Sequence, residues 1–198
     1  TTLNATVAAE TPQVFAIPSY TPSFSVISNT LNSATTWTGG NANDGYYTAT
    51  LPFTFTYFGT DYSTVNIGTN GYVTFGAGST SSAAQTIPTG TPANVIALFE
   101  NDMTLAASGS IQYGYNGTAP NRQFIVKYNA VPGNGSGGPN TGYIVLNEKS
   151  NIIDLVVSSF TRVTGSNATC GIESGSSTGA APAGRNNAAY NVTTAEAW

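Results

Sequence analysis

The sequence contains no histidine, a single cysteine and few charged residues of either sign. Without histidine, Ser-His-Asp catalysis, Cys-His catalysis and every zinc site with a histidine ligand are excluded. One cysteine excludes a disulfide within the chain and a thiolate metal cluster. Charged residues make up 7 % of the 198 residues, and only five are Lys or Arg, so no nucleic-acid partner is expected. No run of 18 apolar residues occurs, and no membrane span is expected.

Hydroxyl and amide side chains take the place of charge, since Ser, Thr and Asn supply about a third of the chain. With 40 % hydrophobic residues beside them, the chain can still bury a core. A low-charge surface with almost no cysteine favours an extracellular or cell-surface location. The opening Thr1-Thr2-Leu3 lacks both Met and a basic stretch followed by an apolar one. We interpret it as a mature N-terminus after signal removal, or as the end of a trimmed fragment.

Apolar residues alternate with polar ones at a period of two, as in Leu51, Phe53, Phe55 and Tyr57. This pattern is typical of strands with one buried face. The strands are short and bounded by Gly, Pro, Asn or Ser, which predicts an all-β fold, an antiparallel β-sandwich or jelly roll. We expect an extended N-terminal strand over 1–12 and a single β-sandwich domain over 13–198. The expected strands are 3–9, 13–18, 24–28, 50–58, 62–68, 71–76, 94–100, 110–115, 122–131, 141–147, 151–159 and 168–173, with a last short one near 190–193.

Several turns in this pattern have a physical basis. Asn70-Gly71 and Asn116-Gly117 each stand between β-rich runs, and both residue types tolerate the positive φ that tight hairpins need. Residues 147–150 separate two further runs, so 141–147 and 151–159 are expected to form a hairpin. The Gly- and Pro-rich stretch 132–139 is expected to be an exposed loop.

Residues 67–76, Ile-Gly-Thr-Asn-Gly-Tyr-Val-Thr-Phe-Gly, resemble the strand–Asn-Gly–strand block of secreted bacterial surface domains related to the nidogen-like extracellular domain. Further stretches resemble that family in the same order: 53–59, 62–65, 94–102, 110–113, 123–128, 142–148 and 170–173. The resemblance covers about 45–175 and implies an extracellular adhesive or matrix β-sandwich with no known enzymatic activity. The chain departs from the family at Phe99 and Tyr128, where Trp is common, and at Asn101, where an acid is common.

The densest group of acidic residues is Glu100 and Asp102 at the end of an apolar run. If the chain stays extended there, both side chains point to one face about 7 Å apart. With Asp44 from the 41–45 loop they could bind Ca²⁺ through oxygen ligands, and Ca²⁺ is the one candidate cofactor. They could also form a glycosidase-like carboxylate pair. The structural alternative is that Asp102 caps a turn by accepting backbone N–H bonds.

Trp37, Tyr46 and Tyr47 lie near that loop in sequence and could stack on a sugar ring, or could pack in the core or at a subunit contact. Surface glycans are therefore a candidate partner. Five Asn-x-Ser/Thr sequons permit glycosylation at Asn4, Asn116, Asn134, Asn167 and Asn191, which is about the number that the composition gives by chance.

The N-terminal segment alternates before Pro12 interrupts it, with Leu3, Ala5, Val7 and Ala9 on one side. This strand could pair within its own subunit as an edge strand. It could instead add to an open sheet edge of another copy, so that the chain itself is the partner in a homopolymer.

These patterns favour a non-enzymatic extracellular structural protein, the subunit of a cell-surface filament, pilus-like thread or tube assembled by N-terminal strand addition. The alternative is a carbohydrate-binding or adhesin module, with or without Ca²⁺. An acid glycosidase using Glu100 and Asp102 is a third hypothesis.

Overall fold

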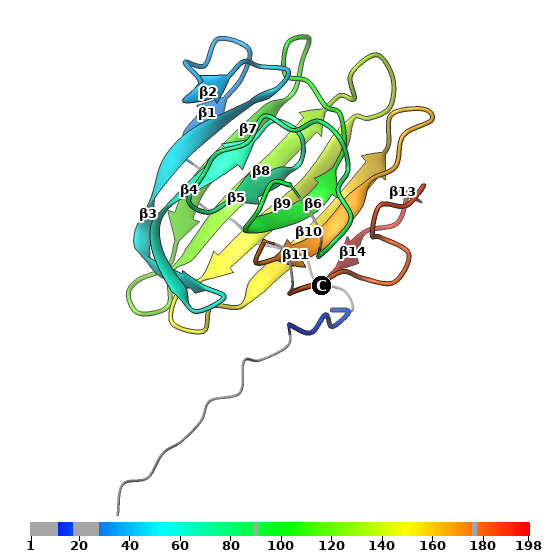
Figure 1. The fold of residues 1–198 in the computed structure, drawn as a ribbon. Helices are drawn as coiled ribbons and strands as arrows, with labels where there is room; N and C mark the ends of the chain where they lie inside the picture. Colours follow the sequence, from blue (N-terminus) through cyan, green and yellow to red (C-terminus); the bar gives the residue numbers. More distant parts are fainter. Residues whose placement is uncertain (1–11, 18–27, 89–90, 176–177) are drawn as a thin grey trace, which may run out of the picture.

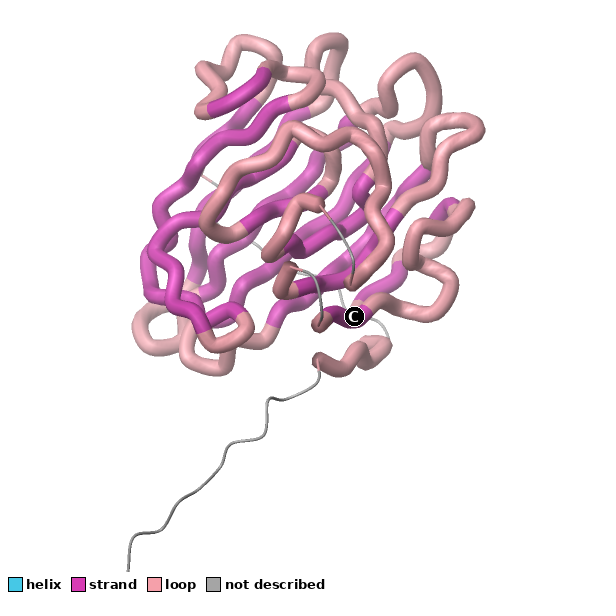
Figure 2. Tube along the Cα trace, viewed as in Figure 1, coloured by secondary structure: helices cyan, strands magenta, loops and turns pink. Residues whose placement is uncertain are grey.

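The computed structural model describes residues 12–17, 28–88, 91–175 and 178–198. Among them every regular element is a β-strand (Figure 2). Sheet I has the order β1-β7-β8-β9-β10-β13, with β14 also paired to β10. Its strands are β1 (Asn29–Leu31), β7 (Ser110–Asn116), β8 (Gln123–Val131), β9 (Asn140–Asn147), β10 (Ile153–Thr161), β13 (Asn191–Val192) and β14 (Glu196–Ala197).

Sheet II has the order β12-β11-β6-β5-β4-β3-β2. Its strands are β2 (Gly39–Gly40), β3 (Gly45–Tyr57), β4 (Thr60–Gly68), β5 (Tyr72–Thr74), β6 (Val95–Glu100), β11 (Thr169–Glu173) and β12 (Gly179–Ala180). All strand pairs are antiparallel, and the two sheets pack face to face (Figure 1). The predicted all-β sandwich is confirmed.

The core lies between the sheets and follows the alternation seen in the sequence. In β3 the buried positions Leu51, Phe53, Phe55 and Tyr57 alternate with more exposed ones. Each buried aliphatic or aromatic side chain contributes about 1.5–3 kcal/mol, so these inward faces account for the pairing of the two layers.

One buried hydroxyl also ties the two sheets together. Tyr128 of β8 reaches across to sheet II, where its Oη lies 2.8 Å from the carbonyl oxygens of Gly68 and Tyr72. Its ring packs edge-on against Phe99 of β6 at 5.4 Å between centroids. Because the residue is fully buried, this polar contact is made without competition from water.

The outer edge of β3 is covered by groups that block further strand pairing. β2 pairs with only two residues at the start of β3. Near the end of β3, the Thr56 N–H donates to Asn151 Oδ1 at 3.0 Å. Pro52 has no N–H to offer, and its carbonyl accepts from the guanidinium of Arg122. Edge strands treated in this way do not template the addition of another chain.

The structure departs from the expected strands mainly where elements are very short. The expected strand 13–18 is wrong as far as residues 12–17 show, because they form no strand. The expected strand 3–9 lies outside the described residues, as does most of 24–28. The hairpins at Asn70-Gly71 and Asn116-Gly117 are confirmed, with Gly71 at φ +81° and Gly117 at φ +83°.

Candidate functional site

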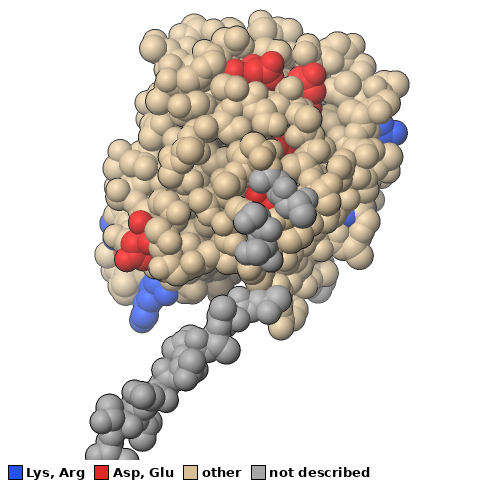
Figure 3. All heavy atoms as spheres, viewed as in Figure 1, with Lys and Arg blue, Asp and Glu red and all other residues tan. Residues whose placement is uncertain are grey.

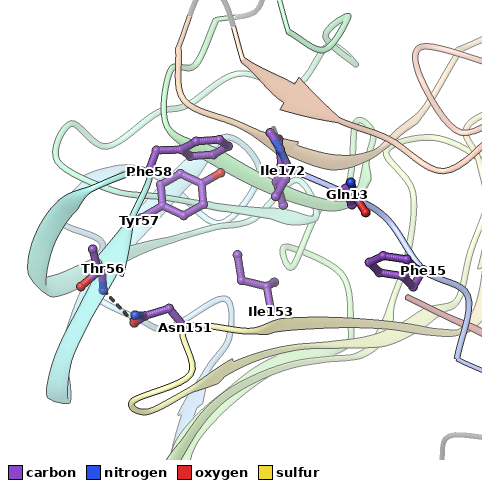
Figure 4. Close-up of a pocket in the computed structure, with 9 residues that line it drawn as sticks. Gln13, Phe15, Thr56, Tyr57, Phe58, Asn151, Ile153 and Ile172 are labelled. Carbon is purple, nitrogen blue, oxygen red and sulfur yellow. Dashed lines mark hydrogen bonds between the residues drawn. The ribbon is translucent and has the colours of Figure 1, made fainter. Parts of the chain in front are cut away.

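An apolar groove opens where the two sheets separate, between β10 of sheet I and β11 of sheet II. One part of it, a cavity of about 410 Å³, is lined by Ile153, Leu155, Ile172 and Trp198 and by the chain's own residues 12–17. A neighbouring hollow of about 730 Å³ continues toward the end of β3, past Tyr57 and Phe58 (Figure 4). In that view Phe58 and Ile172 form the upper side, Ile153 the lower side, and Gln13 and Phe15 the far end.

The backbone at this groove is only partly paired. β14 covers Val156 and Val157 of β10, and β13 covers Phe160 and Thr161. Leu155 and Trp198 exchange two backbone bonds of 2.8 and 2.9 Å. On the same side of β10, no strand of the described chain pairs with Ile153. An extended segment could therefore lengthen the pairing here and place apolar side chains between the sheets.

The chain's own residues 12–17 lie along the groove. The Ile17 N–H donates to Ala197 O at 2.9 Å, which extends sheet I beyond β14 by one bond. Phe15 remains 70 % exposed and Ile152, on the opposite wall, 58 % exposed. These are two of the three large hydrophobic residues that stay exposed among the described residues. Clustered exposed apolar side chains mark interaction sites more often than scattered ones do.

Sequence reasoning did not find this groove. Its walls come from β10, β11 and the C-terminal residues, which are distant in sequence. The consecutive Ile152-Ile153 was the available signal, because two adjacent isoleucines cannot both point into one core when side chains alternate. The predicted assembly residues Leu3, Ala5, Val7 and Ala9 lie outside the described residues.

The predicted acidic triad is not assembled. The strand ends at Glu100, so the extended geometry assumed for Glu100 and Asp102 does not continue. Glu100 is fully buried, whereas Asp102 is half-exposed. Burial raises the pKa of the Asp102 carboxyl, and the nearby charge of Asp44 raises it further. The described residues hold no group of three or more His, Cys, Asp or Glu side chains that could bind a metal.

Asp44 and Asp102 belong to a polar cluster at the edge of the sandwich. Asp44 accepts from Asn43 and Asn70, each at 3.0 Å. The Asn134 N–H donates to the backbone oxygen of Asp102 at 2.9 Å, and the Asn134 side-chain amide donates to Asp102 Oδ2 at 3.4 Å. Turn capping would instead have backbone N–H groups donate to the Asp102 carboxylate. Of the three acidic residues predicted to bind Ca²⁺, Asp44 and Asp102 therefore lie near each other, and Glu100 does not join them.

The three aromatic residues predicted to bind sugars are separated by the fold. Trp37 and Tyr47 are partly buried and pack against the sandwich core, with Tyr47 5.8 Å from Tyr113 between ring centroids. Tyr46 is the neighbour of Tyr47 on β3 and so points to the other face, where its ring lies against Gly39 and Gly78. They do not form a common stacking surface.

Comparison with known proteins places this fold in a family. A family model described as NIDO related matches residues 16–197. The chain belongs to the NIDO-related family. This confirms the resemblance to the nidogen-like domain, and the family suggests an extracellular domain. Searches of curated proteins and of solved structures found no match.

In this NIDO-related chain, the sequons of the described part lie at the surface or near it. Asn134, Asn167 and Asn191 are exposed, and Asn116 is half-exposed at the end of β7. The Asn167 amide donates to Asn187 O and Oδ1 at 3.0 and 3.1 Å. Asn4 lies outside the described residues. No helix of the described chain is long and apolar enough to cross a membrane.

Proposed function

We propose that this chain is an extracellular structural protein, a non-enzymatic subunit that joins copies of itself into a cell-surface filament, pilus-like thread or tube. Residues 1–9 of one copy enter the groove beside β10 of the next, with Leu3, Ala5, Val7 and Ala9 directed into it. The observation that supports this is the apolar groove with an unpaired strand edge at Ile153.

The chemistry of the donor segment suits that groove. Residues 1–9 contain no charged side chain, and the first charge follows at Glu10. The groove is lined mainly by apolar side chains, and the free backbone edge that it offers is at Ile153, beyond the part of β10 that pairs with Trp198, β14 and β13. Residues 12–17 of the subunit's own chain are displaced or moved aside on insertion. Within the described part of the chain, that step breaks the backbone bond from Ile17 to Ala197.

The outer edge of sheet II at β3 is closed to strand addition. The outer edge of β3 is covered by Asn151, Pro52 and Arg122, so it offers no second acceptor of the same kind. A contact between a tail on one copy and a groove on the next does not close on itself and gives an open chain. The surface in Figure 3 carries few charged side chains, so few ions need to be desolvated where copies meet.

The test compares the full chain with a variant lacking residues 1–10, using electron microscopy and light scattering. The full chain is expected to form filaments and the truncated chain to stay a folded monomer. A labelled peptide of residues 1–11 is expected to bind the truncated subunit, measured by fluorescence anisotropy. The same peptide with Leu3→Asp and Val7→Asp is expected to bind at least tenfold more weakly, since each buried aliphatic side chain is worth about 1.5–3 kcal/mol.

A groove variant with a matched control completes the design. Ile152→Asp places a charge on an exposed groove wall and is expected to abolish filaments. Tyr115→Asp alters a comparably exposed residue on β7 and is expected to leave them intact. Filaments of normal length from the truncated chain, or from Ile152→Asp, contradict the strand-addition proposal.

A second candidate is an adhesin that binds glycans through Ca²⁺ held by Asp44 and Asp102. The observation that favours it is the proximity of these two carboxylates at the edge of the sandwich. A glycan array with Ca²⁺ and with EDTA tests it. Binding that disappears in EDTA and in Asp102→Asn supports the adhesin, and no binding under either condition removes it.

A further inference from the structure

The groove beside β10 already holds a segment of the subunit's own chain. This segment is residues 12–17, which we call the strap, and parts of it line both hollows of the groove. Pro12, Gln13 and Phe15 share these hollows with Ile153, whose backbone edge a donor from another copy would extend. Figure 4 shows Gln13 and Phe15 at one end of the hollow that Ile153 also lines. The strap therefore occupies space that a donor beside Ile153 needs.

The strap lies on the sandwich without being part of its core. Of its six residues, Gln13, Phe15 and Ala16 are exposed and the other three are half-buried. Two hollows border it, one of about 410 Å³ that Phe15 lines and one of about 640 Å³ that Val14 and Ala16 line. Protein interiors are close-packed and leave few voids larger than a water molecule. Removing the strap from the groove therefore disturbs little of the packing between the two sheets.

A backbone bond holds the C-terminal end of the strap. The Ile17 N–H donates to Ala197 O at 2.9 Å, beside the bonds that Trp198 exchanges with Leu155 of β10. The strap thus follows sheet I at Ile17 and reaches the side of Ile153 at its other end. One backbone hydrogen bond of this kind changes an equilibrium constant about two- to tenfold. It favours the strap in the groove without fixing it there.

We propose that the strap is an autoinhibitory element, which covers the strand-addition site of the free subunit until a donor from another copy displaces it. This inference rests on the proposed function, because the strap excludes a donor only where strand addition takes place. The donor gains more from the groove than the strap does. Leu3, Ala5 and Val7 of the donor are directed inward, whereas Phe15 of the strap stays 70 % exposed. The exchange therefore proceeds toward the donor.

Competition by the strap sets how readily a subunit accepts a donor. When only a fraction of the subunits has an open groove, the apparent affinity for the donor is reduced by that fraction. Loss of the bond from Ile17 raises the ratio of open to covered grooves by the factor that the bond contributes, about two- to tenfold. Assembly at low subunit concentration should become faster by the same factor.

The first test measures assembly of the full chain, starting from monomer isolated by size-exclusion chromatography and followed by light scattering. Ile17→Pro removes the N–H that donates to Ala197 O, and proline fits an extended backbone. We expect its initial rate of filament growth to rise about two- to tenfold, with filaments of normal appearance in electron microscopy. The matched control Ile17→Val keeps the N–H and a branched side chain, and is expected to assemble at the wild-type rate.

The second test uses the wild-type chain, so it decides the question even where Ile17→Pro folds poorly. Quenched hydrogen exchange compares the Ile17 amide in the monomer and in filaments. We expect exchange at Ile17 to be slowed in the monomer and to become at least severalfold faster in filaments, where the donor has displaced the strap. The Ala168 amide, which donates to Ala188 O at 2.9 Å, is the control and should exchange equally in both states.

The outcomes separate this inference from the function on which it rests. Filaments that form at the same rate from the wild type and from Ile17→Pro overturn the autoinhibition and leave strand addition in place. The same holds for an Ile17 amide that is equally protected in monomer and filament, because the strap then stays on the groove. A full chain that forms no filaments contradicts the proposed function itself, and the inference fails with it.

Discussion

Glu100→Gln should change the way the stability of the protein depends on pH. The folded protein holds the proton on Glu100 up to about pH 8, whereas an unfolded glutamate releases it near its ordinary pKa of 4.5. Between these values the folded state binds more protons than the unfolded state, so the free energy of unfolding falls as pH rises. At about 1.4 kcal/mol per pH unit across this window, the full loss is up to about 5 kcal/mol.

Glutamine has nearly the shape of the protonated acid and cannot ionise, so this loss should be absent from the variant. At pH 5 the two proteins are expected to have similar free energies of unfolding, and at pH 8.5 the variant is expected to be more stable by several kcal/mol, on the order of that loss. Urea unfolding at both pH values measures the difference.

A control with the opposite sign is available in Glu148. The Arg122 guanidinium lowers the pKa of that carboxyl to about 2, so its contribution to stability is present at neutral pH and is lost as pH falls toward 2. Glu148→Gln should therefore be destabilising at pH 7 and neutral at the acid limit. A wild-type protein whose stability relative to Glu100→Gln does not decline between pH 5 and 8.5 refutes the reasoning about Glu100.

Three other substitutions test the contacts that hold the sandwich together. Tyr128→Phe should lower the free energy of unfolding by about 1–3 kcal/mol in urea titration, and Tyr115→Phe, at an exposed position, should not. Arg122→Ala should lower the melting temperature at pH 7 and lower it less near pH 2, where Glu148 is about half protonated and the bond to the Pro52 carbonyl remains. Gly71→Ala should cost about 2–4 kcal/mol, because φ is +81° and the new Cβ would meet core atoms at 2.7–2.9 Å; unchanged stability would contradict that geometry.

The long strands could be predicted from the sequence because alternation is a local signal. The runs expected at 94–100, 110–115 and 122–131 correspond to β6 (Val95–Glu100), β7 (Ser110–Asn116) and β8 (Gln123–Val131). The two-residue strands β2, β12 and β14 could not be predicted, since two residues carry no period. They exist because a longer strand beside them offers backbone groups to pair with.

The sites were harder to predict because they depend on distant segments. In the sequence Glu100 is close to Asp102, but the strand ends at Glu100. Glu100 is fully buried and accepts from the Gln85 N–H, whereas Asp102 is half-exposed. Glu173 is an isolated acid in the sequence, and the pairing of β11 with β6 places it on the same face of sheet II as Val95. In the same way, Ile153 and Ile172 form a groove only because β10 and β11 belong to different sheets.

The blocked flank of β3 has a consequence for crowding at a surface. Secreted β-rich molecules held close together tend to fuse side by side, since any bare backbone edge recruits a neighbour. Here Pro52 offers no donor and Asn151 and Arg122 already occupy their partners, so the flank is inert toward other copies. This flank of sheet II therefore resists lateral backbone pairing even where many copies are crowded together.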